Sequence, residues 1–267
     1  MKFLLIFSAF FLFSCSSTKK AISGIETPLP KNISLNGKLY TALFMQRAAE
    51  YRALCLQGYN IARMRMENYI PLSAKSRAII TDIDETILDN SAYAVHQAFI
   101  GKEYIVEDWF DWTAMAAADT MPGAASLLNY AATKNIEVFY LTNREEKERI
   151  GTLKNLQHFN LPFADEKHLI TRLTTSSKEA RRQQLMNNYE IVLLLGDNLA
   201  DFSSLFDKKS EAERKANVDL TSGEFGKKFI MFPNPNYGDW ESSLYRFKNG
   251  LGQGQKDSII RSVLKTY

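Results

Sequence analysis

The chain has 267 residues, of which 45% are hydrophobic and 24% are charged, an ordinary balance for a globular protein. The formal net charge of +3 is too small to indicate a nucleic-acid polymer as partner, and no run of lysine and arginine would follow a phosphate backbone. With only two cysteines there is no disulfide framework, and Cys55 is predicted to be a small core residue.

The N-terminus has the pattern of a secretory signal. An almost unbroken apolar run at 4–13 follows one basic residue and is too short to span a membrane as a stable helix. Leu12 and Ser14 precede Cys15 in an order that resembles the lipobox of bacterial lipoproteins. The resemblance implies a lipoprotein signal peptide at 1–14 and lipidation of Cys15. An ordinary signal peptide with an incidental cysteine is the alternative.

A lipid on Cys15 would anchor the protein to a membrane of the cell envelope. Ser16 favours the outer membrane through a sorting rule that varies among bacteria. Residues 15–36 are polar and contain two prolines, which is typical of a tether between a lipid and a domain.

Residues 37–267 are long enough for one domain. Apolar residues recur at spacings of three and four within 39–69, which predicts a packing helix or a helix pair. Continuous apolar runs predict strands at 78–80, 136–141, 168–170, 191–195 and 227–232. Helices are predicted at 124–134, 145–159 and 178–185, and within 240–267.

This alternation of helices with apolar strands predicts an α/β fold, a Rossmann-like parallel sheet with helices on both faces. The insertion at 91–121, with Trp109 and Trp112, is rich in alanine and shows no strand alternation. We expect it to form a small helical cap together with the helices at 39–69.

Polar residues follow directly after several of the predicted strands or open a helix. Because the C-terminal ends of parallel strands meet at one edge of a sheet, where ligands bind, these residues are expected to lie together. They are Asp82, Asp84, Thr142, Lys178, Asp197 and Asp201.

This combination favours a phosphate site with a metal ion. Carboxylates gathered without a cation repel one another, and Mg²⁺ prefers oxygen ligands, so Asp82 and Asp197 are the candidate ligands. Thr142 and Lys178 are candidate phosphate anchors. A calcium loop starting at Asp82 is excluded, because its sixth position is Ile87 instead of glycine. For the acidic pair alone, a solvated loop is the simplest alternative.

The motifs together resemble the phosphohydrolases of the haloacid dehalogenase superfamily, in particular the class C acid phosphatases and 5′-nucleotidases, which are bacterial outer-membrane lipoproteins. The ordered set is specific and spans nearly the whole chain, whereas each motif alone is not specific. The motifs lie at 51–62, 80–91, 139–144, Lys178, 196–202 and 225–241.

The resemblance implies a mechanism. Asp82 attacks phosphorus to form an aspartyl-phosphate, and Asp84 serves as general acid and then general base, which favours mildly acidic pH. Thr142 and Lys178 bind the phosphoryl group. Mg²⁺ is held by Asp82, the backbone carbonyl of Asp84 and Asp197. Asp201 orients the waters of the ion or Lys178.

The resemblance also implies a small-molecule phosphomonoester as substrate, with 5′-nucleotides and aryl phosphates expected. Trp109 and Tyr237 are the candidate stacking residues, and Asn143 and Arg144 are further candidate substrate ligands; Asn143 is also a candidate helix cap. Packing of the insertion is the alternative role for Trp109 and the preferred one for Trp112.

Three other functions stay open at this point. They are a narrower sugar-phosphate phosphatase, a phosphotransferase, and a non-catalytic phosphate-binding lipoprotein. A homo-oligomer is compatible with the sequence.

Overall fold

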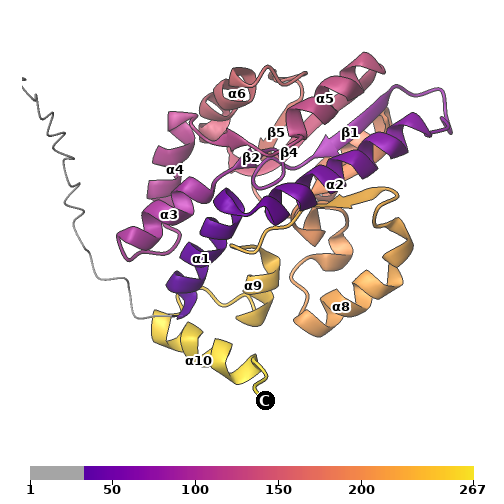
Figure 1. Ribbon diagram of the computed structural model, residues 1–267. Helices are drawn as coiled ribbons and strands as arrows, with labels where there is room; N and C mark the ends of the chain where they lie inside the picture. Colours follow the sequence, from indigo (N-terminus) through magenta and orange to yellow (C-terminus); the bar gives the residue numbers. More distant parts are fainter. Residues whose placement is uncertain (1–32) are drawn as a thin grey trace, which may run out of the picture.

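The computed structural model describes residues 33–267 (Figure 1). The predicted signal peptide at 1–14, Cys15 and most of the predicted tether lie outside the described residues. Within 33–267, no helix is both long and apolar enough to cross a membrane.

The first described segment is a helix pair, which was one of the two alternatives predicted for it. Helix α1 (Ile33–Arg47) and helix α2 (Ala49–Glu67) are separated at Ala48, whose φ of −81° and ψ of 127° are extended. Helix α1 starts before position 37, so the helical part of the chain includes the end of the segment predicted as a tether.

A parallel sheet of five strands forms the centre of the described part, with the order β5-β4-β1-β6-β7. Strand β1 is central: Ile79 pairs with Val138 on one side and with Leu193 on the other. The sequence predicted every one of these strands. They are β1 (Arg77–Thr81), β4 (Ile136–Glu145), β5 (Leu169–Arg172), β6 (Glu190–Gly196) and β7 (Phe229–Met231).

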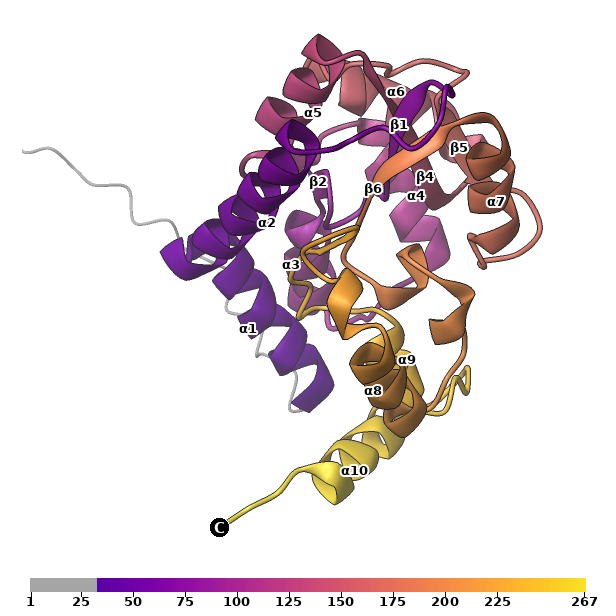
Figure 2. The same cartoon turned by 90° about the vertical axis from the view of Figure 1, so that its right-hand side faces the viewer.

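Helices cover both faces of the sheet. Figure 2 shows α2 and α5 (Ala124–Thr133) on one side and α7 (Glu179–Asn188) on the other. Helix α6 (Arg149–His158), preceded by a 3₁₀ turn at Glu146–Glu148, contributes Leu153 and Leu156 to the same core as α2 and α5. The α/β class predicted from the sequence is therefore confirmed.

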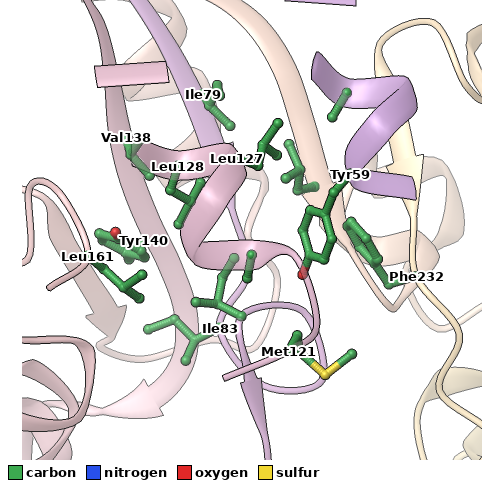
Figure 3. Packing of buried hydrophobic residues seen from close by; sticks show 14 of the residues in the cluster. Tyr59, Ile79, Ile83, Met121, Leu127, Leu128, Val138, Tyr140, Leu161 and Phe232 are labelled. Atoms are coloured by element: carbon green, nitrogen blue, oxygen red, sulfur yellow. The ribbon is translucent and has the colours of Figure 1, made fainter. Parts of the chain in front are cut away.

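The larger core includes buried residues of α2, α5 and α6. Figure 3 shows part of it, with Tyr59 of α2 beside Leu127 and Leu128 of α5. The rings of Tyr59 and Phe232 pack at 4.3 Å between centroids, so α2 is fixed to the segment that follows β7. Cys55, on the same helix, is buried and free, as predicted. The smaller core, on the α7 side, includes Leu185 and Phe202.

The insertion after β1 contains α3 (Ser91–Phe99) and α4 (Val106–Met115). Its two ends are joined by an antiparallel pair, β2 (Leu88–Asp89) with β3 (Asp119–Thr120), which sequence analysis did not predict.

The remaining helices belong to the C-terminal third. They are α8 (Glu211–Leu220), α9 (Asp239–Leu244), α10 (Gln253–Val263) and 3₁₀ turns at Leu199–Asp201, Ser204–Phe206 and Ser222–Glu224. Helix α10 lies at the N-terminal end of α1 (Figure 1), where the Asp257 carboxylate accepts hydrogen bonds from the backbone N–H groups of Ile33 and Ser34 at 3.1 and 3.3 Å. Lys256 on α10 forms an ion pair with Glu103, in the loop between α3 and α4.

Candidate active site

The C-terminal edge of the sheet opens into a cavity of about 640 Å³. Asp82 follows β1 and Asp197 follows β6, and these strands are hydrogen-bonded neighbours. Of the residues predicted for the site, those that line the cavity are Asp82, Asp84, Trp109, Asn143, Arg144, Lys178, Asp197, Asp201 and Tyr237.

An acidic cluster lies at the base of this cavity. Asp82, Asp197 and Asp201 each place one carboxylate oxygen within 4.8 Å of the other two. Gly196, the last residue of β6, permits this approach, because a Cβ atom there would lie 2.4 Å from Asp201 Oδ2.

A buried lysine partly neutralises the cluster. Lys178, directly before α7, donates hydrogen bonds from Nζ to Asp82 Oδ1 and to Asp201 Oδ1, the latter at 2.7 Å. Burial disfavours the charged ammonium, but Asp201 and Asp82 outweigh burial and raise the pKa of Lys178 above its usual value. Asp201 also accepts a hydrogen bond from the backbone N–H of Asn198 at 3.0 Å, so both of its oxygens have partners.

The cluster still holds more negative charge than one lysine can balance. Burial raises the pKa of Asp82 to about 7, although Lys178 opposes this shift. Burial and the neighbouring Asp82 and Asp201 raise the pKa of Asp197 well above its usual value. Ionisation of these carboxyl groups is unfavourable unless positive charge is added, and oxygen donors are the ligands that divalent cations prefer. The cluster therefore fits a divalent cation, which would lower the pKa values of Asp82 and Asp197.

Two side chains hold the Asp84 carboxylate by hydrogen bonds. Arg144 donates to Asp84 Oδ1 from Nη2 at 2.7 Å and from Nε at 3.1 Å, and Asn90 donates to the same oxygen from Nδ2 at 2.9 Å. Arg144 was predicted as a substrate ligand, and in the structure its guanidinium is committed to Asp84 and to Thr152.

The segment after β4 differs from the expectation. The strand continues through Thr142 to Glu145, and a capping box made by Glu145 and Glu148 starts the following helix, so the prediction of Asn143 as a cap is wrong. Thr142 is fully buried, and its hydroxyl oxygen accepts from the backbone N–H of Arg144 at 3.0 Å. Asn143 accepts a hydrogen bond from Arg181 at 2.8 Å.

Aromatic side chains form the outer part of the cavity. Trp109 lies edge-on to Tyr93, with 5.2 Å between ring centroids, and the Tyr237 hydroxyl donates to Glu85. Trp112 does not line the cavity; its indole N–H donates to Asn90 Oδ1 at 2.9 Å. The outer wall also includes the C-terminal residues Tyr245 and Lys256.

Sequence reasoning gave no role to several residues that support the site. Glu85 is buried with a φ of 55°, and Asn234 donates to Asp197 Oδ2 at 2.8 Å. Glu85 and Asn90 lie within the motif around Asp82, so their position in that motif was the available signal. The segment after β7 offered a similar signal for Asn234.

Fold and site together are those of the haloacid dehalogenase superfamily. Residues 12–240 match the family model described as HAD superfamily, subfamily IIIB (acid phosphatase), and the chain belongs to this family. The family and the acid phosphatase class predicted from the sequence are confirmed.

A solved structure agrees with this assignment. The class C acid phosphatase from Bacillus anthracis, a structure with tungstate bound, is 36% identical and superposes with a TM-score of 0.84. The match covers 87% of this chain and 98% of that chain.

Two curated relatives match over a part of their length. Acid phosphatase 1 of Solanum lycopersicum is 30% identical over 131 residues, which are 46% of this chain and 50% of that protein. A component of the nuclease SbcCD of Staphylococcus epidermidis is 29% identical over 139 residues, which are 51% of this chain and 12% of that protein. This chain therefore spans half or less of the length of these two relatives.

Proposed function

We propose that this acid phosphatase hydrolyses 5′-nucleotides and aryl phosphates in a Mg²⁺-dependent reaction through an aspartyl-phosphate on Asp82. The observation that carries the proposal is the buried cluster in which Lys178 joins Asp82 to Asp201, with Asp197 beside them and Asp84 two residues after Asp82.

In the first step a carboxylate oxygen of Asp82 attacks phosphorus, and the bond from phosphorus to the ester oxygen breaks. Asp84 gives a proton to the leaving oxygen. In the second step Asp84 takes a proton from a water molecule that attacks the aspartyl-phosphate, which releases phosphate and restores Asp82. Lys178 stabilises the negative charge on the transferring group.

Asp82 and Asp197 would hold the metal ion together with the backbone carbonyl of Asp84. Asp201 would position Lys178, because its oxygens are already used by Lys178 and by the backbone of Asn198. When bound, the ion supplies charge stabilisation for the phosphoryl oxygens. By lowering the pKa of Asp82 it would also keep the nucleophile ionised in mild acid.

The aromatic residues in the outer part of the cavity support the proposal that the substrates carry a ring in the leaving group. Trp109 and Tyr237 both line the cavity, and stacking tolerates many kinds of ring. The tungstate in the Bacillus anthracis structure is an oxyanion, which is in keeping with a phosphoryl site in this family.

The test is phosphate release from nucleotides, aryl phosphates and sugar phosphates, with Mg²⁺ or with EDTA. We expect activity with Mg²⁺, loss in EDTA, and a fall in kcat of about 10⁴-fold or more for Asp82→Asn, because removal of a nucleophile has effects of this order. Full activity of Asp82→Asn would contradict the aspartyl-phosphate route. Turnover of sugar phosphates alone would favour the narrower phosphatase.

We also propose that Cys15 is lipidated and anchors the enzyme in the cell envelope, in the outer membrane. The support is the lipobox-like segment before Cys15. Fractionation of cells that express the full chain should place it with membranes, and Cys15→Ser should release it. Equal membrane association of both proteins would contradict the anchor.

A further inference from the structure

The two carboxylate oxygens of Asp84 have unequal surroundings. Oδ1 accepts three hydrogen bonds, two from Arg144 and one from Asn90, at 2.7 to 3.1 Å. Among the described residues, Oδ2 has only the Nε atom of Arg144, at 3.3 Å. One oxygen of this carboxyl group is thus anchored, and the other keeps most of its bonding capacity.

The orientation of the Asn90 amide is fixed mainly by Trp112, with Arg144 Nη2 as a more distant second donor to Asn90 Oδ1 at 3.5 Å. The indole N–H of Trp112 can only donate, and it lies 2.9 Å from Asn90 Oδ1. The Nδ2 group of Asn90 must therefore face Asp84. Asn90 is buried and Trp112 belongs to α4, so helix α4 of the insertion helps to set the direction of a hydrogen bond to Asp84.

The guanidinium of Arg144 is also held in place by a hydrogen bond, in this case to a residue of helix α6. Its Nη1 atom donates to Thr152 Oγ1 on α6 at 3.1 Å, and the Thr152 hydroxyl in turn donates to the backbone carbonyl of Glu148 at 2.8 Å. Arg144 is almost completely buried, which leaves its planar group little freedom to turn away from Asp84.

We infer that Asn90 and Arg144 are positioning residues that anchor Asp84 Oδ1 and leave Oδ2 as the oxygen that exchanges the proton with the leaving group. Trp112 and Thr152 act one step further away, by orienting Asn90 and Arg144. The inference rests on the proposed function, in which Asp84 is the general acid.

This arrangement has a chemical consequence in the first step. When the ester bond breaks, its electron pair stays on the leaving oxygen and accepts the proton from Asp84 Oδ2, while the phosphoryl group moves to Asp82. A good leaving group, such as 4-nitrophenolate, needs this proton little, whereas phenolate needs it more. Misplacing Oδ2 should therefore slow the poorer leaving group selectively.

The experiment compares kcat/KM for phenyl phosphate and 4-nitrophenyl phosphate, two esters of similar size, in the full-length protein with Mg²⁺. The ratio kcat/KM reports the steps up to the aspartyl-phosphate. We expect Trp112→Phe, which keeps a ring and removes the N–H donor, to lower kcat/KM about tenfold for phenyl phosphate and less than about twofold for 4-nitrophenyl phosphate. Thr152→Val, which keeps the shape, should show the same selectivity with a smaller amplitude.

Tyr140→Phe is the matched control. It removes a hydrogen bond of 2.7 Å to Pro162 on the core side of β4 and should alter both esters by the same factor. An equal loss for both esters in Trp112→Phe and Thr152→Val, or no loss in either variant, would overturn the inference. If Trp112→Phe does not fold, Thr152→Val decides alone. A wild-type enzyme inactive on both esters would overturn the proposed function itself.

Discussion

The two halves of the cavity are built differently. The half at the sheet edge is formed by buried charged residues, Asp82, Asp197 and Lys178, next to central strands and the start of α7. The outer half is formed by Trp109 on α4 and Tyr237 in a loop, both more exposed, and by the C-terminal segment. A buried half suits the phosphoryl chemistry that all phosphomonoesters share, whereas the more exposed outer half can differ between enzymes without disturbing that chemistry.

Substitution of Lys178 should give the largest effect that distinguishes the roles of the two halves. Lys178→Met removes the cation that joins Asp82 and Asp201. We expect kcat to fall by about 10²–10³-fold for every ester, because loss of one stabilising donor has effects of this order. Steady-state kinetics on a nucleotide and on a small alkyl phosphate test this. A loss confined to the nucleotide would contradict the assignment of Lys178 to the phosphoryl half.

Changing Trp109 should have the opposite selectivity. Trp109→Ala is expected to raise KM about tenfold for a nucleoside 5′-monophosphate, because base stacking on an aromatic ring contributes about 1–3 kcal/mol. KM for a small alkyl phosphate should stay nearly constant. Trp109→Phe, which retains a ring, is the control. Equal effects of Trp109→Ala on both esters would contradict stacking.

A smaller effect is expected from the ion pair between Lys256 and Glu103, which joins α10 to the loop between α3 and α4 at the outer wall. Its side chains are about one-fifth exposed, and such pairs contribute up to about 1 kcal/mol. Lys256→Met should therefore raise KM for nucleotides up to about fivefold and spare small esters. The charge-swapped pair Glu103→Lys with Lys256→Glu should recover part of the loss. No selectivity for nucleotides would exclude this role.

The last prediction concerns the stability of the folded chain as a function of pH, in the absence of metal. Burial raises the pKa of Asp82 to about 7 in the folded chain, against about 3.9 when unfolded. The folded state then holds a proton that the unfolded state releases, so this stabilisation is present in acid and is lost as the pH rises from about 4 to about 7. A pKa difference of this size corresponds to about 4 kcal/mol. In EDTA, the melting temperature should therefore fall by roughly 10 °C over this range. Mg²⁺ should reduce this fall in melting temperature. A melting temperature that does not change with pH in EDTA would contradict the raised pKa of Asp82.

The sheet and its edge were predictable because their signals are local. Each strand of the sheet contains a short apolar run, and Asp82 and Asp197 come directly after the last residues of β1 and β6. The parallel topology then requires both residues to share one edge.

Other features had no local signal. Strands β2 and β3 have two residues each, too few for any periodicity. Helix α8 buries only Arg214, so it has no apolar stripe by which to recognise it. The hydrogen bond from Arg144 to Asp84 joins residues 60 positions apart and depends on the depth at which β4 ends. Such a contact is determined by packing, which the spacing of residues does not encode.

The closure of the cavity by the C-terminal segment has a consequence for synthesis. Asp82 and Lys178 are translated well before Tyr245 and Lys256, which form part of the outer wall. The carboxylate of Asp257 also joins α10 to the first turn of α1, so the first and last helices of the described chain meet only after α10 has been made. A nascent chain that already contains the whole sheet thus still has an open, unfinished pocket, and a premature stop after β7 would leave the nucleophile in place without the wall that faces the substrate.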